Sequence, residues 1–164
     1  MNHPFEGANK AKSIWYRTDT GCICPKPSRS EVFQFPTRYL HFDSIGEYTL
    51  WHRLVICPSV AFVDLHYQQE LLPATESEAA IYWNIDFRIG LKDMTKPIIL
   101  VEFKGNYIRQ SSFNRDALLL RYRLLKRNMP KQAQFYVVTE GTPYNLCKEF
   151  STITTQQLLT ILGQ

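Results

Sequence analysis

Two acidic residues and a lysine lie in two neighbouring apolar segments, and their types suit the cleavage of a phosphodiester bond. Asp86 stands near the end of residues 80–89, and Glu102 and Lys104 stand near the end of residues 97–105. Hydrolysis of a phosphodiester requires an activated water and positive charge around the transition state. Two carboxylates can bind a magnesium ion that provides both, and a lysine on the same face can orient or deprotonate the water.

Both segments are predicted to be strands of one hairpin, because they are rich in β-branched and aromatic residues and residues 90–97 between them carry turn-forming and charged side chains. Residues two apart in a strand share a face, so Glu102 and Lys104 point to the same side. A symmetric hairpin centred near Met94 sets Asp86 directly opposite Glu102. Like charges at such adjacent positions repel each other, so a divalent cation is the expected partner.

An alternative needs no metal. Asp86, Arg88, Glu102 and Lys104 can instead form a neutral ladder of cross-strand ion pairs on a solvated face of the sheet. Residues 98–101 are apolar on both faces, which is typical of a buried central strand. Charged groups at the end of such a strand need partners or a function, and residue types alone leave both alternatives open.

The composition excludes several classes. The chain has 164 residues, of which 45% are hydrophobic, and this suits one compact domain. It has no apolar stretch long enough to span a bilayer and no secretory segment, so we expect a soluble cytoplasmic protein. Glycine-rich phosphate loops and a Gly-x-Ser-x-Gly elbow are absent, which disfavours nucleotide hydrolysis and serine hydrolase chemistry.

Cys22 and Cys24 lack the spacing of zinc ligands, so reduced thiols are expected. His52 and His66 have no ligand partner at helical spacing, which favours core or surface roles for both.

Residues 1–30 are rich in glycine, proline and basic residues and are predicted to form an arm, which either lies along nucleic acid or is a solvated tail. Residues 31–164 are expected to form a single domain. The predicted elements are extended segments at 32–35 and 39–42, strands at 60–65, 80–89, 97–105 and 133–139, and helices at 44–56, 112–128 and 154–162. This order predicts an α/β fold with a mixed sheet flanked by helices.

The helix at 112–128 is predicted to be the longest, with an apolar face made of Phe113, Ala117, Leu120 and Leu124, and with Leu118, Tyr122 and Leu125 beside it. The region around it is strongly basic, because residues 104–131 contain eight basic residues and one acid, Asp116. Like charges three or four apart destabilise a helix unless a phosphate backbone offsets them. The residues predicted to bind DNA are Arg109, Arg115, Arg121, Arg123, Lys126 and Arg127. A solvated helix face is the alternative.

The arrangement of the acidic residues and the lysine resembles the PD-(D/E)XK nuclease superfamily. Its motif stands here as Ile85-Asp86 followed by Glu102-Phe103-Lys104, without the proline that often precedes the aspartate. The resemblance implies a restriction-endonuclease-like core with a mixed central β-sheet flanked by helices. It also implies Mg²⁺ as the cofactor, with Mn²⁺ able to substitute, and hydrolysis that leaves a 5′-phosphate.

The upstream sequence resembles the catalytic domain of TnsA-type transposon-end nucleases, over about residues 36–140. Residues 39–47, 57–60 and 67–70 resemble that domain's helix-borne glutamate, its Pro-x-Val turn and its glutamine-bearing strand. The resemblance implies that Glu47 joins Asp86 and Glu102 as a metal ligand in a catalytic set completed by Lys104, and that Gln69 (or Gln68) is the family's glutamine. Ser44 to Glu47 also form a capping box, which gives Glu47 an alternative role.

The resemblance therefore implies a magnesium-dependent DNA endonuclease that processes transposon or other mobile-element DNA, in a bacterial, phage or mobile-element context. It would act as a homodimer or with a transposase or recombinase partner. The family's C-terminal winged helix has no counterpart here, so a stand-alone nuclease of a phage, mobile element or repair system is expected. Two alternatives are a Holliday-junction-resolvase-like or repair nuclease, and a DNA-binding or assembly protein that has lost cleavage on the same fold.

Overall fold

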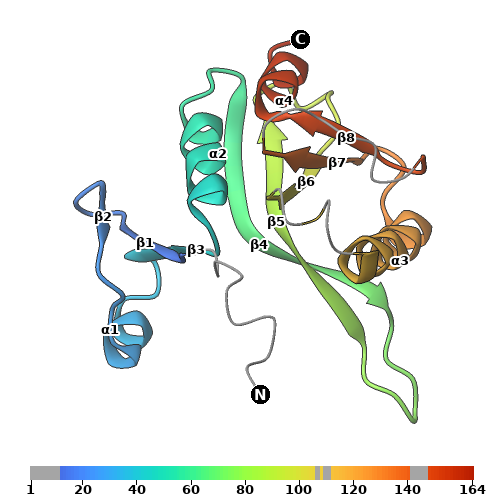
Figure 1. The fold of residues 1–164 in the computed structure, drawn as a ribbon, viewed down its shortest axis with the longest axis horizontal. Coiled ribbons are helices and arrows are strands. Elements are labelled where there is room, and N and C mark those ends of the chain that lie inside the picture. Colours follow the sequence, from blue (N-terminus) through green and yellow to red (C-terminus); the bar gives the residue numbers. More distant parts are fainter. Residues whose placement is uncertain (1–11, 106–107, 109–111, 141–147) are drawn as a thin grey trace, which may run out of the picture. The chain divides into compact units, whose positions relative to one another are not determined.

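The computed structural model describes residues 12–105, 108, 112–140 and 148–164, and the chain divides into two compact units, Met1–Thr49 and Leu50–Gln164 (Figure 1). The division falls inside helix α2 (Ile45–Val55). The sequence placed its boundary earlier, after residue 30. Within the described residues, no helix combines the length and the apolar character that crossing a membrane requires.

The N-terminal unit contains a three-stranded antiparallel sheet of order β2-β1-β3 and one short helix. Its elements are β1 (Ile14–Arg17), β2 (Cys22–Cys24), α1 (Arg29–Gln34) and β3 (Tyr39–Phe42). The sequence predicted no regular structure in the first two of these. Gly21, with a φ of +68°, turns β1 into β2, and Trp15 packs on His41 across the sheet with ring centroids 4.6 Å apart.

The segment at 32–35, expected to be extended, is helical instead. Ser28 and Glu31 form a capping box, in which the Ser28 hydroxyl accepts from the Glu31 amide and the Glu31 carboxylate accepts from the Ser28 amide. These two bonds satisfy amides at the start of α1 that would otherwise have no partner. The capping signal outweighed the β-propensity of Val32 and Phe33.

The C-terminal unit is built on a five-stranded sheet of order β4-β5-β6-β7-β8. Its elements are β4 (Val60–Leu72), β5 (Ile81–Leu91), β6 (Ile99–Lys104), α3 (Ser112–Asn128), β7 (Gln134–Thr139), β8 (Ser151–Thr154) and α4 (Thr155–Leu162). β4, β5 and β6 are antiparallel neighbours, whereas β6, β7 and β8 run parallel. The expected α/β class and the mixed sheet flanked by helices are confirmed.

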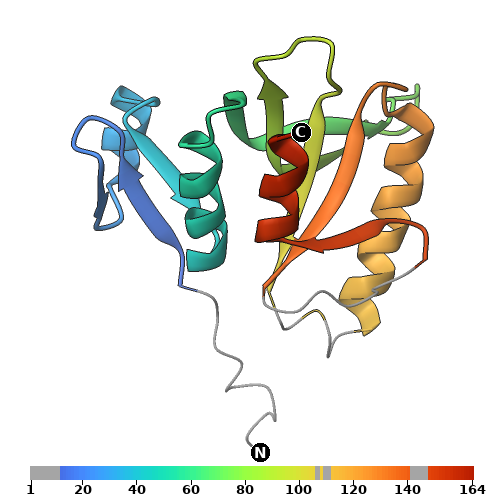
Figure 2. The ribbon, with the colours of Figure 1, turned by 90° about the horizontal axis from the view of Figure 1, so that it is seen from above.

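Each face of this sheet carries its own core, and Figure 2 shows α3 and α4 on opposite sides of β6 and β7. Leu158 and Leu162 of α4, with Leu50 and Leu54 of α2, pack on one face. The side chains from α3 that pack on the other face are Leu118, Tyr122 and Leu125.

The apolar face predicted for α3 is wrong at Phe113 and Leu120, whereas Ala117 and Leu124 are half-buried. Phe113 is 79% exposed and Leu120 is 59% exposed, whereas Leu118 and Leu125 are buried. Tyr122 explains why this side of α3 is buried, because its ring centroid lies 5.4 Å from that of Phe135 and 5.2 Å from that of Phe150. Both stripes of apolar residues have helical spacing, so these aromatic partners determine which stripe is buried.

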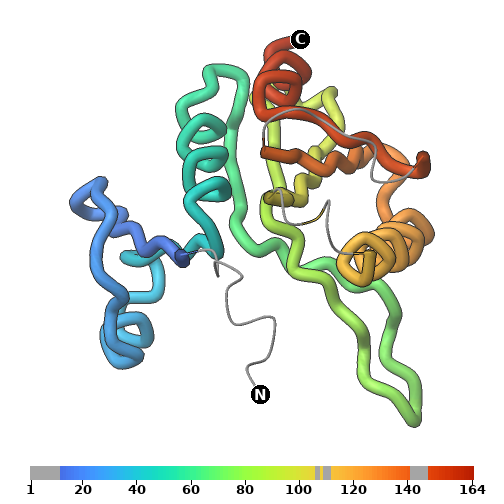
Figure 3. Tube along the Cα trace, viewed as in Figure 1, coloured from blue at the N-terminus to red at the C-terminus, as the bar shows by residue number. Residues whose placement is uncertain are grey.

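The side chains of β5 pack into two different hydrophobic cores, one in each half of the strand. Its pairing with β6 extends from Phe87 to Ile89, whereas its pairing with β4 continues far beyond this point. Figure 3 shows the β4–β5 ribbon running on past the rest of the sheet. Along one face of β5, Phe87 and Ile89 belong to the core under α4, and Trp83 and Ile85 belong to the core under α3. The strand therefore leaves β6 and twists at Asp86.

Candidate active site

Asp86 and Glu102 lie together where the backbone ladder between β5 and β6 ends. The observed register pairs Phe87 with Val101, so the hairpin has the alignment expected from the sequence. Beyond this pair, the Phe103 backbone N–H donates to Asp86 Oδ2 at 2.7 Å, and the Asp86 backbone N–H lies 3.4 Å from Glu102 Oε2. Side-chain carboxylates thus replace backbone carbonyls as acceptors where the strands separate.

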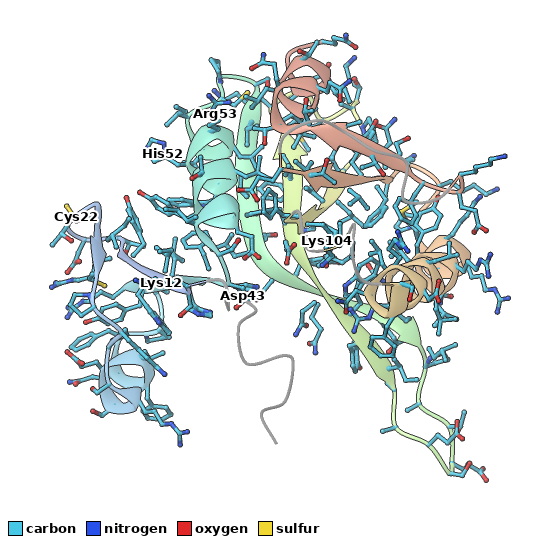
Figure 4. The ribbon with its side chains drawn as sticks, in the orientation of Figure 1. Lys12, Cys22, Asp43, His52, Arg53 and Lys104 are labelled. Carbon is cyan, nitrogen blue, oxygen red and sulfur yellow. The ribbon has the colours of Figure 1, made fainter. Side chains whose placement is uncertain are left out.

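Lys104 completes this cluster from the end of β6 (Figure 4). Its Nζ donates to Glu102 Oε1 at 2.5 Å, and the side chains are 16% and 4% exposed, respectively. The two residues share a face of the strand, as predicted. A charge-assisted bond at this low exposure is stronger than a surface ion pair and fixes both groups in place.

Two members of the expected ion-pair ladder, Arg88 and Glu102, have charged partners in the structure. Arg88 pairs with Asp64 on β4, with Nη2 and Nε lying 2.6 and 2.7 Å from Asp64 Oδ2, respectively. Glu102 pairs with Lys104 along its own strand. Each acidic residue of the β5–β6 edge therefore has a different environment, with Asp86 bonded to a backbone amide and Glu102 bonded to an ammonium group.

The donor set fits a magnesium ion in its chemistry. Asp86 and Glu102 offer hard carboxylate oxygens, and Mg²⁺ is usually held by one or two carboxylates, with water and phosphate filling its other positions. In the described ranges no three His, Cys, Asp or Glu side chains are grouped so that they could hold a metal. A site of this kind would therefore rest on two protein ligands from this cluster.

Glu47 lies in the N-terminal unit and makes helix-capping bonds. It is 8% exposed, its backbone N–H donates to Ser44 Oγ at 3.1 Å, and its Oε2 accepts from the Asp43 amide at 3.0 Å. The capping role is therefore present, with the glutamate reaching the residue before the N-cap. Its role as a metal ligand stays a prediction.

Gln69 lies on β4, where its side-chain amide donates to the carbonyl of Glu70 at 3.1 Å. It lines a pocket formed with Tyr67 and Arg88. In the register of β4 with β5 it stands opposite Trp83, three positions along the ribbon from Asp86. The family role implied for this glutamine stays a prediction.

His66 is the residue that sequence reasoning did not place at the site. The pairs Leu65–Phe87 and Tyr67–Ile85 flank it, so its backbone lies opposite Asp86 on the side away from Glu102. Its φ of +49° is left-handed, a conformation that costs a non-glycine residue roughly 1–2 kcal/mol. Backbone strain of this kind clusters at functional sites. The sequence carries no signal for it beyond the tolerance of histidine for this region.

Thr139 adds a polar group beside Lys104. The two residues are register partners on the parallel strands β6 and β7. Thr139 is 2% exposed, and its hydroxyl has no hydrogen-bond partner among the residues that the structure describes. A buried hydroxyl of this kind usually meets water or a ligand, which suits a site at the carboxyl ends of two parallel strands.

The basic residues of α3 do not form one stripe. At 3.6 residues per turn, Arg121 lies on one flank of the buried stripe and Arg115 and Lys126 on the other, with Arg127 facing away from it. Arg123 is paired with Glu149, with Nη2 2.6 Å from Oε1. The predicted DNA contact Arg109 lies outside the described residues. Arg115, near the start of α3, is the basic residue of that helix closest in sequence to the end of β6.

No family model matches this sequence, and no curated protein matches it.

Proposed function

We propose that the chain is a divalent-metal-dependent DNA endonuclease and that its C-terminal unit is a restriction-endonuclease-like domain of the PD-(D/E)XK type, related to TnsA-type nucleases. The observation that carries the proposal is the convergence of Asp86, Glu102 and Lys104 where β5 leaves β6. The order of the mixed sheet, with the lysine strand at its centre, supports the fold assignment.

In this proposal Asp86 and Glu102 hold the ion. Bound Mg²⁺, or Mn²⁺ in its place, would polarise the phosphate and acidify a water. The Phe103 amide fixes the orientation of the Asp86 carboxylate. Lys104, held by Glu102, either positions the attacking water or neutralises charge on the phosphate. The expected products are a 5′-phosphate and a free 3′-hydroxyl, formed in the cytoplasm by a homodimer or with a transposase or recombinase partner.

A second candidate is a DNA-binding or assembly protein without cleavage. The observation that favours it is the Glu102–Lys104 pair, because the two charges already neutralise each other at low exposure. A resolvase-like or repair nuclease differs from the first proposal in the shape of its substrate alone.

Cleavage assays separate these proposals. Supercoiled plasmid, linear duplex and a four-way junction would each be incubated with protein and Mg²⁺, Mn²⁺ or EDTA. We expect metal-dependent cutting that Asp86→Asn and Lys104→Ala abolish while DNA binding persists. Asp93→Asn is the matched control, because Asp93 lies in the β5–β6 turn and its carboxylate accepts local hydrogen bonds from the amide and hydroxyl of Thr95. Binding without cutting in either metal would refute the nuclease, and a preference for the junction would favour the resolvase.

A further inference from the structure

A pocket lies between β4, the β5–β6 hairpin and the connection from α3 to β7, and Arg88 and Leu100 are its lining residues nearest the candidate site along β5 and β6. Its volume is about 360 Å³, and its wall combines aromatic, aliphatic and polar side chains that include Phe62, Tyr67, Gln69, Arg88 and Leu100. This size is in the range of sites that hold small organic groups. All of these residues belong to the C-terminal unit.

The edge of the pocket at Arg88 and Leu100 lies two residues from Asp86 and Glu102 along β5 and β6. Arg88 and Leu100 are cross-strand partners, and Asp86 and Glu102 follow them by two residues on β5 and β6. Leu100 and Glu102, two residues apart on β6, share a face of that strand and are separated by roughly 6.6 Å along it. A phosphate held at Asp86 and Glu102 would therefore bring its own nucleotide within reach of the pocket.

Flat groups cluster in the wall of the pocket. The Arg88 guanidinium lies 4.5 Å from the Tyr67 ring centroid and 5.4 Å from that of Phe62, and Asp64 fixes its orientation. Gly90 makes room for the Phe62 ring, because a Cβ at this position would lie 2.1 Å from Phe62 Cε1. Aromatic rings and guanidinium planes are the surfaces on which unpaired bases stack.

We propose that this pocket binds one unpaired nucleobase next to the scissile phosphate, so that the preferred substrate is DNA with an extruded or single-stranded nucleotide at the cleavage position. A base inside a duplex has both faces covered by its neighbours and cannot enter such a pocket without leaving the stack. The amide of Gln69 at the wall can hydrogen-bond to the edge of the base. The inference rests on the proposed function, because the phosphate site at Asp86 and Glu102 supplies its geometry.

The test measures binding rather than cleavage. Fluorescence anisotropy, in Mg²⁺ and with the Lys104→Ala variant that should bind without cutting, would compare three labelled duplexes: fully paired, with a one-nucleotide bulge, and with the same bulge lacking its base. We expect the base-containing bulge to bind about fivefold or more tightly than the abasic one. Tyr67→Leu and the more exposed Phe62→Leu should remove this preference, whereas Tyr67→Phe should keep it.

The outcomes are distinguishable. Equal affinity for the base-containing and abasic bulges would overturn the pocket assignment while leaving the nuclease proposal intact. If the protein prefers the base-containing bulge but never cuts DNA, the nuclease proposal is refuted and the pocket assignment stands. Failure to bind any of the three DNAs would refute both. Thermal melting of each variant confirms that the fold is intact.

Discussion

The Asp86 carboxylate accepts a hydrogen bond from the backbone N–H of Phe103 at 2.7 Å, at the point where strand β5 departs from β6. One side chain thus closes the backbone ladder and also faces the neighbouring Glu102. Substitutions of Asp86 can therefore distinguish its hydrogen bond to the backbone from its proposed role as a metal ligand.

We predict that Asp86→Asn and Asp86→Ala differ in stability but not in activity. The asparagine oxygen can still accept from the Phe103 amide, whereas alanine leaves that N–H without its acceptor, at a cost of about 1–3 kcal/mol. Urea denaturation measures the difference. Both variants should lose metal-dependent cleavage, because neither has the charged ligand. Equal stability of the two variants would contradict the structural role.

Lys104 is predicted to stabilise the fold through Glu102. Lys104→Met leaves a buried carboxylate without its ammonium partner, and loss of one member of a buried pair costs about 3 kcal/mol. The double variant Glu102→Gln/Lys104→Met should recover most of that loss. A double-mutant cycle of unfolding free energies gives the coupling energy, and strict additivity would argue against the pair.

His66→Gly tests the strained backbone opposite Asp86. Glycine adopts a φ of +49° without the cost that histidine bears, but it also gains about 0.5–1 kcal/mol of entropy in the unfolded chain. We expect His66→Gly to be more stable than His66→Ala by up to about 1 kcal/mol, because both variants lack the imidazole and its contacts, and we expect a clear loss for the β-branched His66→Val. If the imidazole also serves the site, both His66→Gly and His66→Ala will cleave more slowly than wild type.

The pair of Arg123 and Glu149 predicts a dependence of stability on pH. The hydrogen bonds from Arg123 hold the pKa of the Glu149 carboxyl below its ordinary value. As the pH falls, the unfolded chain takes up this proton first, so the stabilisation is complete above the ordinary range of glutamate and is lost through the lower pKa of the folded chain. The stability difference between wild type and Glu149→Gln should shrink on acidification and in high salt, since the pair is exposed. A stability difference that grows on acidification would contradict a lowered pKa for Glu149.

The buried stripe of α3 predicts unequal costs for two leucines. Leu125→Ala should destabilise the protein by about 2–5 kcal/mol, because the side chain is fully buried in the core. Leu120→Ala should change stability by less than about 0.5 kcal/mol. Chemical denaturation of both variants checks the choice, and similar costs would favour the stripe predicted from the sequence.

Much of the site's framework is local, and this explains why it was predictable. The turn-rich segment between two β-rich segments determined the hairpin, its register and the proximity of Asp86 and Glu102. Pro130 and the helical spacing located α3. Three features depend on distant partners instead: the buried face of α3, which the rings of Phe135 and Phe150 select, the pairing of β1 with β3, and the left-handed His66. No pattern within a single segment specifies them, because each is decided when segments meet.

The change of core along one face of β5 makes Asp86 sensitive to packing on both sides of the sheet. Ile85 is anchored among the side chains of α3 and Phe87 among those of α2 and α4. Because packed interiors transmit small displacements instead of absorbing them, a cavity under either neighbour would shift the carboxylate between them. We therefore expect that a small cavity beside Ile85 or Phe87 reduces cleavage while the protein still folds.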